Sequence, residues 1–183
     1  MTQLALKKLL TESDCTPARV CAEIARMFSV RTSEVGLLHL DGRMLRVLFP
    51  DELRAAGSIP LSGSTIAART AVTRRVECFN NFAQVSHHSI FEFVKIGDEP
   101  NDSSQTIQKL MSAPVIGVDD TVLGVLQISR KGVSPGAAGR DFDVEDLKTL
   151  EEAAKELGKV LPRLVSDTRK SEHALRFHAS GGH

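Results

Sequence analysis

The fold of this chain is decided by the stretch LMSAPVIGVDDTVLGVLQIS, residues 110–129. Two runs rich in Val, Ile and Leu, residues 110–118 and 122–129, flank a short acidic turn at residues 119–121. Such residues pack well on a pleated surface, and a polar turn between two of these runs is typical of a hairpin. The sequence therefore predicts a β-hairpin whose strands are largely buried.

A loop and a helix follow this hairpin. Residues 132–139 (GVSPGAAG) are too rich in Gly and Pro for regular structure and predict an exposed loop. Asp143 is placed to cap the next helix, with Glu145 and Asp146 in its first turn near the positive end of the helix dipole. A stripe at intervals of three and four residues predicts one apolar face: Leu147, Leu150, Ala154, Leu157, Leu161 and Leu164. Pro162 should kink or stop this helix.

The residues before the hairpin predict further helices and strands. Residues 3–10 and 17–29 read as helices, the second capped by Thr16 with Pro17 in its first turn. Residues 35–40 and 43–49 flank Asp41-Gly42, a strong hairpin signal. A helix opened by residues 62–65 should end near Arg75. A strand at 76–80 should follow, and then residues 81–108 as long irregular structure or a short helix.

This order of elements predicts an α+β domain. We expect an antiparallel sheet with the terminal helices on one face and a layer of helix and loop on the other. We assign residues 1–16 to an N-terminal helix and linker, residues 17–165 to the domain, and residues 166–183 to a polar C-terminal tail whose last residues are disordered. The leucines of residues 3–10 need a partner, because so short a helix is marginal alone.

The composition is that of an ordinary globular protein. Of 183 residues, 42% are hydrophobic and 25% are charged, with 23 basic and 23 acidic side chains. Zero net charge gives no field that attracts nucleic acid, and the absence of Trp and Tyr leaves few platforms for base stacking. No apolar run approaches the roughly 18 residues that span a bilayer. We therefore expect a cytoplasmic protein that binds neither nucleic acid nor a membrane.

The cysteines and histidines do not form a recognisable metal or redox motif. Cys15, Cys21 and Cys78 are odd in number and lack C-x-x-C spacing, which favours reduced and mostly buried thiols. His87 and His88 are adjacent, and neighbouring side chains in an extended chain point in different directions. We expect these loop histidines to be solvated or hydrogen-bonded rather than metal ligands, and the sequence names no cofactor.

Two strings in the chain resemble a known family. APVIGVDDTVLGVLQISRK, followed by FDVEDLKTLEEAAKELG, resembles the C-terminal half of a GAF domain. Upstream, IPLSGSTIAARTAVTRRVECFNNF is similar to the preceding GAF segment, with Ala68 where many relatives have Gly. The resemblance covers roughly residues 17–165. It implies a module that senses small molecules and dimerises, and only rarely an enzyme.

The resemblance also implies where a ligand would bind. In GAF domains the ligand lies between the sheet and the layer formed by the middle helix and the long loop. Carried over by position, with two helix-start residues added on physical grounds, the candidate ligand-binding residues are Phe49, Ser64, Thr65, Ile66, Ala67, Asn81, Phe82, Thr106 and Gln127. Gln127 stands where cyclic-nucleotide-binding relatives often recognise a base edge.

The start of the middle helix is a candidate site on physical grounds alone. Free N–H groups at a helix N-terminus attract phosphate or carboxylate, and the small residues Ser64 and Thr65 permit close approach. The alternative interpretation is that Ser62 or Ser64 simply caps the helix.

One family signature is only partly present. Cyclic-nucleotide binders usually carry an Asn-Lys-Phe-Asp-Glu set, of which Phe142 and Asp146 fit here. Residues 129–131 (Ser-Arg-Lys) replace the first pair and Leu147 replaces the last Glu, which argues against cyclic nucleotides. An ion pair of Arg130 or Lys131 with Asp146 would pin the loop to the helix.

The resemblance implies a non-catalytic sensory or regulatory module in signal transduction. We expect an unidentified small-molecule ligand and a homodimer formed through the terminal helices. In this hypothesis the ligand orders residues 81–108 and changes the packing of those helices.

Two alternatives remain open at this point. The first is a structural dimerisation module whose pocket is collapsed and filled by Phe79, Phe82, Phe91 and Phe93. The second is a thiol-dependent redox enzyme of the free methionine sulfoxide reductase type, which needs Cys78 exposed with a low pKa.

Overall fold

The computed structural model describes residues 2–82, 85 and 106–179 of the chain. Its α-helices are α1 (Thr2–Thr11), α2 (Pro17–Phe28), α3 (Ile66–Thr73), α4 (Val144–Gly158) and α5 (Leu161–Ala179), with short 3-10 helices η1 (Thr32–Glu34) and η2 (Asp51–Ala56). Its strands are β1 (Val35–Asp41), β2 (Met44–Phe49), β3 (Ser58–Pro60), β4 (Glu77–Phe79), β5 (Thr106–Ile116) and β6 (Val122–Gly132).

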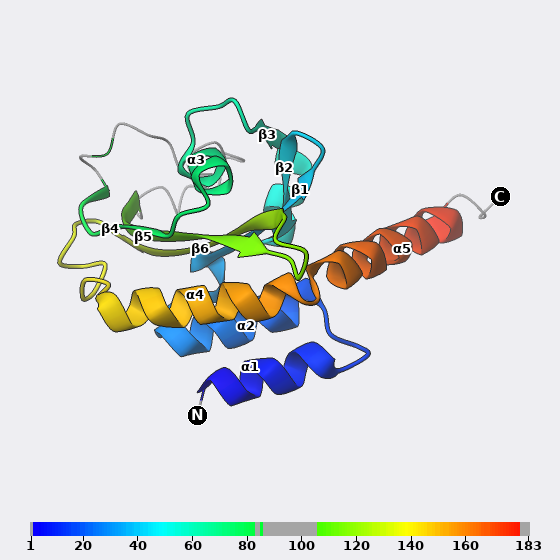
Figure 1. Cartoon of the computed structure of the whole chain (residues 1–183), viewed down its shortest axis with the longest axis horizontal. Helices are drawn as coiled ribbons and strands as arrows, with labels where there is room; N and C mark the ends of the chain where they lie inside the picture. The colour runs from blue at the N-terminus through cyan, green and yellow to red at the C-terminus, as the bar shows by residue number, and fades with distance from the viewer. Residues whose placement is uncertain (1, 83–84, 86–105, 180–183) are drawn as a thin grey trace.

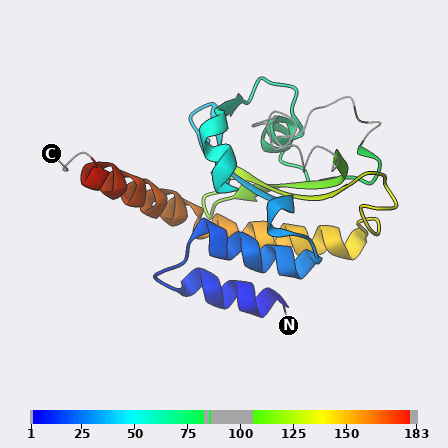
Figure 2. The same ribbon diagram turned by 180° about the vertical axis from the view of Figure 1, so that it is seen from behind.

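The strands form one antiparallel sheet that is covered on both faces. The sheet has six strands in the order β3-β2-β1-β6-β5-β4. Figure 1 shows α2 and α4 on one face with α1 outside them, and α3 on the other face; Figure 2 shows the same layers from behind. The α+β class and the two-faced arrangement predicted from the sequence are therefore confirmed.

The predicted hairpin is the centre of this sheet. It is formed by β5 and β6, each of 11 residues, so both strands run longer than the sequence predicts. β5 pairs with β4 on its other side and β6 pairs with β1, so neither strand is an edge. The turn is closed by Asp119, whose Oδ1 accepts hydrogen bonds from Thr121 Oγ1 at 2.7 Å and Thr121 N at 3.3 Å.

The face under α2 and α4 holds the main hydrophobic core. All but the first of the predicted stripe residues on α4 and α5 are buried there, and Leu147 is partly buried against them. The predicted caps are present. Thr16 Oγ1 accepts from Arg19 N at 3.3 Å, and Asp143 Oδ1 accepts from Asp146 N at 2.9 Å. These caps satisfy N–H groups that the helices leave unpaired.

The leucines of α1 find their partner within the same chain. Leu6 and Leu10 are buried against α2 and α4, and Leu9 is partly buried. Leu4, by contrast, is 72% exposed. The partner that the sequence predicts for these leucines is therefore supplied by α2 and α4 for all but Leu4.

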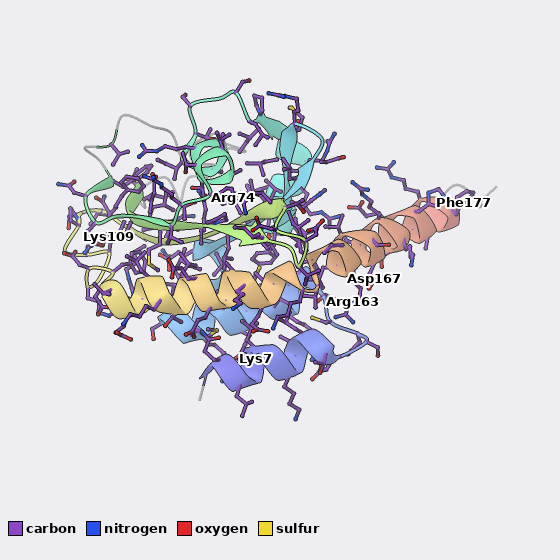
Figure 3. The ribbon with its side chains drawn as sticks, in the orientation of Figure 1. Lys7, Arg74, Lys109, Arg163, Asp167 and Phe177 are labelled. Atoms are coloured by element: carbon purple, nitrogen blue, oxygen red, sulfur yellow. The ribbon has the colours of Figure 1, made fainter. Side chains whose placement is uncertain are left out.

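The chain breaks near Pro162 and then continues as a helix. α4 ends at Gly158, and Pro162 lies in the first turn of α5, where a missing N–H costs little. Residues 166–179, predicted as a polar tail, are helical and lead away from the sheet (Figure 1). Arg163 anchors the base of α5 by donating to the carbonyls of Leu10 at 2.7 Å and Glu12 at 3.2 Å (Figure 3).

The loop before α4 is held to the helix by Arg140 instead of the predicted Arg130 or Lys131. Arg140 donates to both carboxylate oxygens of Asp146, at 2.6 and 2.8 Å, and this pair holds the pKa of Asp146 below its ordinary value. Arg130 instead lies 4.8 Å from the centroid of the Phe142 ring and donates to the Phe28 carbonyl.

No helix among residues 2–82 and 106–179 is long and apolar enough to cross a membrane.

The close approach of α4 to the sheet gives a test of this packing. A Cβ added at Gly158 would clash with the backbone carbonyl oxygen of Ile116 on β5, because the helix and strand touch there. We expect Gly158→Ala to lower the free energy of unfolding by about 1–3 kcal/mol, measured by denaturant titration. Gly136→Ala is the matched control, since a Cβ there meets open space. Equal stability of both variants would contradict the packing.

Candidate functional site

The helix α3 is opened by a single capping threonine. Thr65 Oγ1 accepts a hydrogen bond from Ala68 N at 3.1 Å, and the Thr65 side chain is buried. Ser62 and Ser64, which the sequence offers as alternative caps, are both exposed. The cap directs α3 across β5 and β6, against which it packs. The Thr65 hydroxyl therefore serves as the cap of α3.

Polar side chains line up across the sheet beneath α3. In the strand register Gln127 on β6 lies opposite Gly36 on β1 and Ser112 on β5, and Ser112 lies opposite Glu77 on β4. Residues directly opposite each other in antiparallel strands share a face of the sheet. We call Gln127, Ser112 and Glu77, together with Thr70 of α3 above them, the polar row.

The hydrogen bonds within the polar row run in one direction. Thr70 Oγ1 donates to the Ile66 carbonyl at 2.8 Å and lies 2.7 Å from Ser112 Oγ. Because the single hydroxyl hydrogen of Thr70 is used, Ser112 must donate to Thr70. Ser112 Oγ in turn accepts from Gln127 Nε2 at 3.1 Å. This chain fixes the orientation of the Gln127 amide, with its nitrogen toward Ser112.

The chain leaves two buried acceptors unused. Gln127 is fully buried, and within the described part of the chain its Oε1 has no hydrogen-bond donor. Glu77 Oε1 accepts from Arg69 Nη2 of α3 at 2.7 Å, whereas Glu77 Oε2 is buried and has no donor among the described residues. A buried polar atom without a partner is costly and calls for an explanation. Both atoms are acceptors, so the group that would satisfy them is a donor.

Apolar clusters flank the polar row on the α3 face. On one side lie Leu38, Val125 and the alanines of α3, including Ala67. On the other side Ile66 packs with Phe82, Ile107 and Leu110, and Phe79 is partly buried against them. Apolar side chains therefore flank the row, and a hydrogen bond made at its buried residues is strengthened by the low local polarity.

The structure brings some of the predicted site residues together at this face and places others elsewhere. Gln127 belongs to the polar row, and Ile66, Ala67 and Phe82 belong to the clusters that flank it. Three other predicted site residues are exposed to solvent: Ser64, Asn81 and Thr106.

Phe49 does not lie on this face. The register jumps between Leu37 and Leu38, so that Phe49 pairs with Leu37 and Val47 pairs with Leu38. The intervening Leu48 is an extra residue, and both it and Phe49 pack in the core under α2 and α4. This irregularity in the strand pairing removes Phe49 from the candidate site.

The sequence analysis missed the partners that orient Gln127. Thr70 and Ser112 are fully buried, and Glu77 pairs with Arg69 of α3. Ser112 and Thr70 are polar residues within otherwise apolar stretches of β5 and α3, and that contrast was the available signal. Their alignment depends on the pairing of distant strands, which the sequence does not display.

The three thiols pack on the opposite face of the sheet. Cys15 and Cys21 are buried in the core under α2 and α4, and Cys78 is partly buried against it. Burial raises the pKa of Cys78, and the charges of Asp146 and Asp141 raise it further. Cys21 is buried so deeply that its pKa also rises. A thiol with a raised pKa holds little of the reactive thiolate.

The predicted loop histidines cannot be placed in the structure. His87 and His88 lie outside the described residues. Among residues that the structure does describe, no three of His, Cys, Asp or Glu gather in a way that could hold a metal ion.

Comparisons with known proteins agree with this architecture. The GAF domain family matches residues 18–161. No curated protein sequence matches the chain significantly. Among solved structures, the GAF domain of an Acinetobacter phosphoenolpyruvate-protein phosphotransferase is 14% identical, with 90% of this chain and 93% of that chain covered and a TM-score of 0.64. Free methionine-R-sulfoxide reductase from Neisseria meningitidis, solved with its substrate, is 18% identical, with coverages of 92% and 89% and a TM-score of 0.61.

A third solved structure is similar over most of its length. It is a putative GAF sensor protein from Burkholderia vietnamiensis, 19% identical, with 85% of each chain covered and a TM-score of 0.54. At such identities these likenesses show the fold alone, whereas the family match spans most of the chain. This protein belongs to the GAF domain family.

Proposed function

We propose that this chain is a regulatory GAF module in signal transduction that binds a small molecule at the polar row between the sheet and α3. The observation that carries the proposal is the buried Gln127 Oε1, which has no donor among the described residues while Gln127 Nε2 is held by Ser112. A module that binds no ligand gains nothing from this unpaired acceptor, because its cost is borne in every folded molecule.

The chemistry of the polar row selects a class of ligand. Gln127 Oε1 and Glu77 Oε2 both accept hydrogen bonds, and Glu77 is an acid. A ligand that fits them carries N–H donors, as an amine, an amide or a purine does. An anion without donors would face two acceptors. The expectation of phosphate or carboxylate at the start of α3 is a separate proposal and draws no support from the polar row.

The placement of the thiols supports a non-catalytic role. A thiol-dependent reductase needs a reactive cysteine at its substrate site. Here Cys78 is directed to the opposite face from the polar row, and its pKa is raised. We therefore propose a binding module rather than a redox enzyme, and we assign it to the cytoplasm, in keeping with its reduced cysteines.

A second candidate function is favoured by a specific observation. Phe82 is buried against Ile66, Ile107 and Leu110, and Phe79 packs beside them, so one flank of the polar row is filled by the chain itself. This agrees with a dimerisation module that holds no ligand. Phe91, Phe93 and most of residues 81–108, which the ligand-ordering hypothesis involves, lie outside the described residues.

The terminal helices supply the proposed dimer contact. Leu175 on α5 is 71% exposed, and Leu4 on α1 is exposed to a similar extent. Figure 3 shows Phe177 near the far end of α5, well away from the sheet. We propose that α5 pairs with the same helix of a second copy, which would bury Leu175.

The ligand class can be tested with matched pairs of compounds. Thermal unfolding would be followed with amino acids, with the 2-oxo acids of the same carbon skeletons, and with purines. A ligand at about 100 times its dissociation constant adds roughly 2.7 kcal/mol of stability, which raises Tm by roughly 5–10 °C. We expect a shift from a compound that carries N–H donors and none from its 2-oxo counterpart, and we expect Gln127→Met to abolish the shift.

Each other outcome of this screen has a distinct meaning. A shift with 2-oxo acids that Gln127→Met leaves unchanged would contradict the proposed site. A flat panel, with the protein dimeric, would favour the dimerisation module.

The dimer contact can be tested by sedimentation velocity. We expect Leu175→Glu to shift the protein from dimer to monomer, because a buried carboxylate in the helix pair is costly. Val133→Glu is the matched control, since Val133 is also 71% exposed but lies in the loop before α4. A wild-type protein that stays monomeric, or a Leu175→Glu variant that stays dimeric, would contradict this arrangement.

A further inference from the structure

A hollow lies at the base of α5, apart from the polar row. It has a volume of about 250 Å³, is open to solvent, and is lined by β1, β2, the η2 segment and one face of α5. None of its lining residues belongs to the polar row. Thr168 and Val165 contribute the α5 wall, and His39 contributes from β1. The volume is somewhat below the roughly 300–1,000 Å³ of pockets for drug-sized ligands, so its occupant would be small.

The lining of this hollow is rich in arginine, and each of these arginines is paired with a carboxylate. Three arginines line it, Arg46 on β2, Arg54 in η2 and Arg169 on α5, against the single carboxylate of Glu172. They come from three different elements and converge on one space. Guanidinium groups bind carboxylate and phosphate oxygens in a paired geometry that lysine cannot reproduce.

The acidic neighbours leave binding capacity on these arginines. Asp41 serves two of them, Arg46 at 3.0 Å and Arg169 at 3.4 Å. Arg54 pairs with Glu172 across the hollow and with Asp51 at 3.4 Å. Each guanidinium has five N–H donors, more than these contacts use. The Glu172 carboxylate on Arg54 also shows which chemical group the wall accepts.

The pKa of the buried His39 imidazole is affected by the same arginines and by Asp41. Its pKa is lowered first by burial and then by Arg169, Arg46 and Arg54, with only Asp41 acting in the opposite direction. Positive neighbours therefore outweigh the negative one at this point. A neutral imidazole beside the arginines can donate or accept one more hydrogen bond.

We propose that this hollow binds a small oxyanion, a phosphate or an organic carboxylate, which bridges Arg169 of α5 to Arg46 and Arg54 of the sheet side. The bound anion joins α5 to the body of the domain. Leu161 and Leu164 hold α5 through the core, and Arg163 holds it through the carbonyls of Leu10 and Glu12. Beyond these residues, α5 is held to the domain at this hollow by Val165, Thr168 and ion pairs. The anion therefore adds to the contacts that hold α5, independently of any ligand at the polar row.

The test measures binding of inorganic phosphate, succinate and citrate to the full chain by isothermal titration calorimetry, with succinamide as the uncharged counterpart of succinate. The variants are Arg54→Gln and Arg169→Gln. Arg74→Gln is the matched control. Arg74 follows α3, its ion pair with Asp120 has a length of 2.6 Å, and it does not line the hollow (Figure 3). Thermal unfolding of each variant establishes that it is folded.

We expect saturable binding of at least one oxyanion, no binding of succinamide, and affinity reduced by about tenfold or more in both hollow variants but unchanged in Arg74→Gln. Binding of phosphate alone or of carboxylates alone identifies the source of the oxyanion. A second readout is the His39 ring signal in NMR, whose pKa should rise when the anion binds, because a negative charge then faces the imidazole. Absence of saturable binding, or equal affinity in all three variants, would overturn the proposal.

Discussion

The structure depends on one constraint, which is that the β5–β6 hairpin is buried on both faces. Side chains alternate along a strand, so consecutive residues serve different layers. Leu126 and Ile128 enter the core under α2 and α4, while Gln127 between them faces α3. The strands that hold the domain together are therefore the strands that carry the candidate site. Only the thickness of the sheet therefore separates the side chains that face α3 from those that pack against α4.

The sequence predicted the elements better than it predicted the site. The hairpin, the caps of α2 and α4 and the break near Pro162 follow from local patterns, which tertiary contacts reinforce. The sequence did not predict that residues 166–179 are helical. This polar segment continues the helix that begins at Leu161, and a helix is easier to extend than to start. The polar row depends on strand register, and the displacement of Phe49 depends on one extra residue in β2. Neither is a local property.

The two proposed sites offer opposite hydrogen-bonding groups to a ligand. The polar row offers acceptors beneath α3, and the hollow at the base of α5 offers donors from three arginines. They share β1, since Gly36 lies opposite Gln127 and His39 lines the hollow. In the two proposals together, the ligand would act on the sheet from one face and the anion would add to the contacts that hold α5.

The central claim is that Gln127 is retained for binding at a cost to stability. The most direct measurement is the free energy of unfolding of the unliganded Gln127→Met variant by denaturant titration. Methionine fills a similar volume and removes the unpaired acceptor, so we predict stability equal to the wild type or higher by about 1 kcal/mol. A loss of about 2–3 kcal/mol, as expected for a buried amide whose hydrogen bonds are all satisfied, would contradict the account.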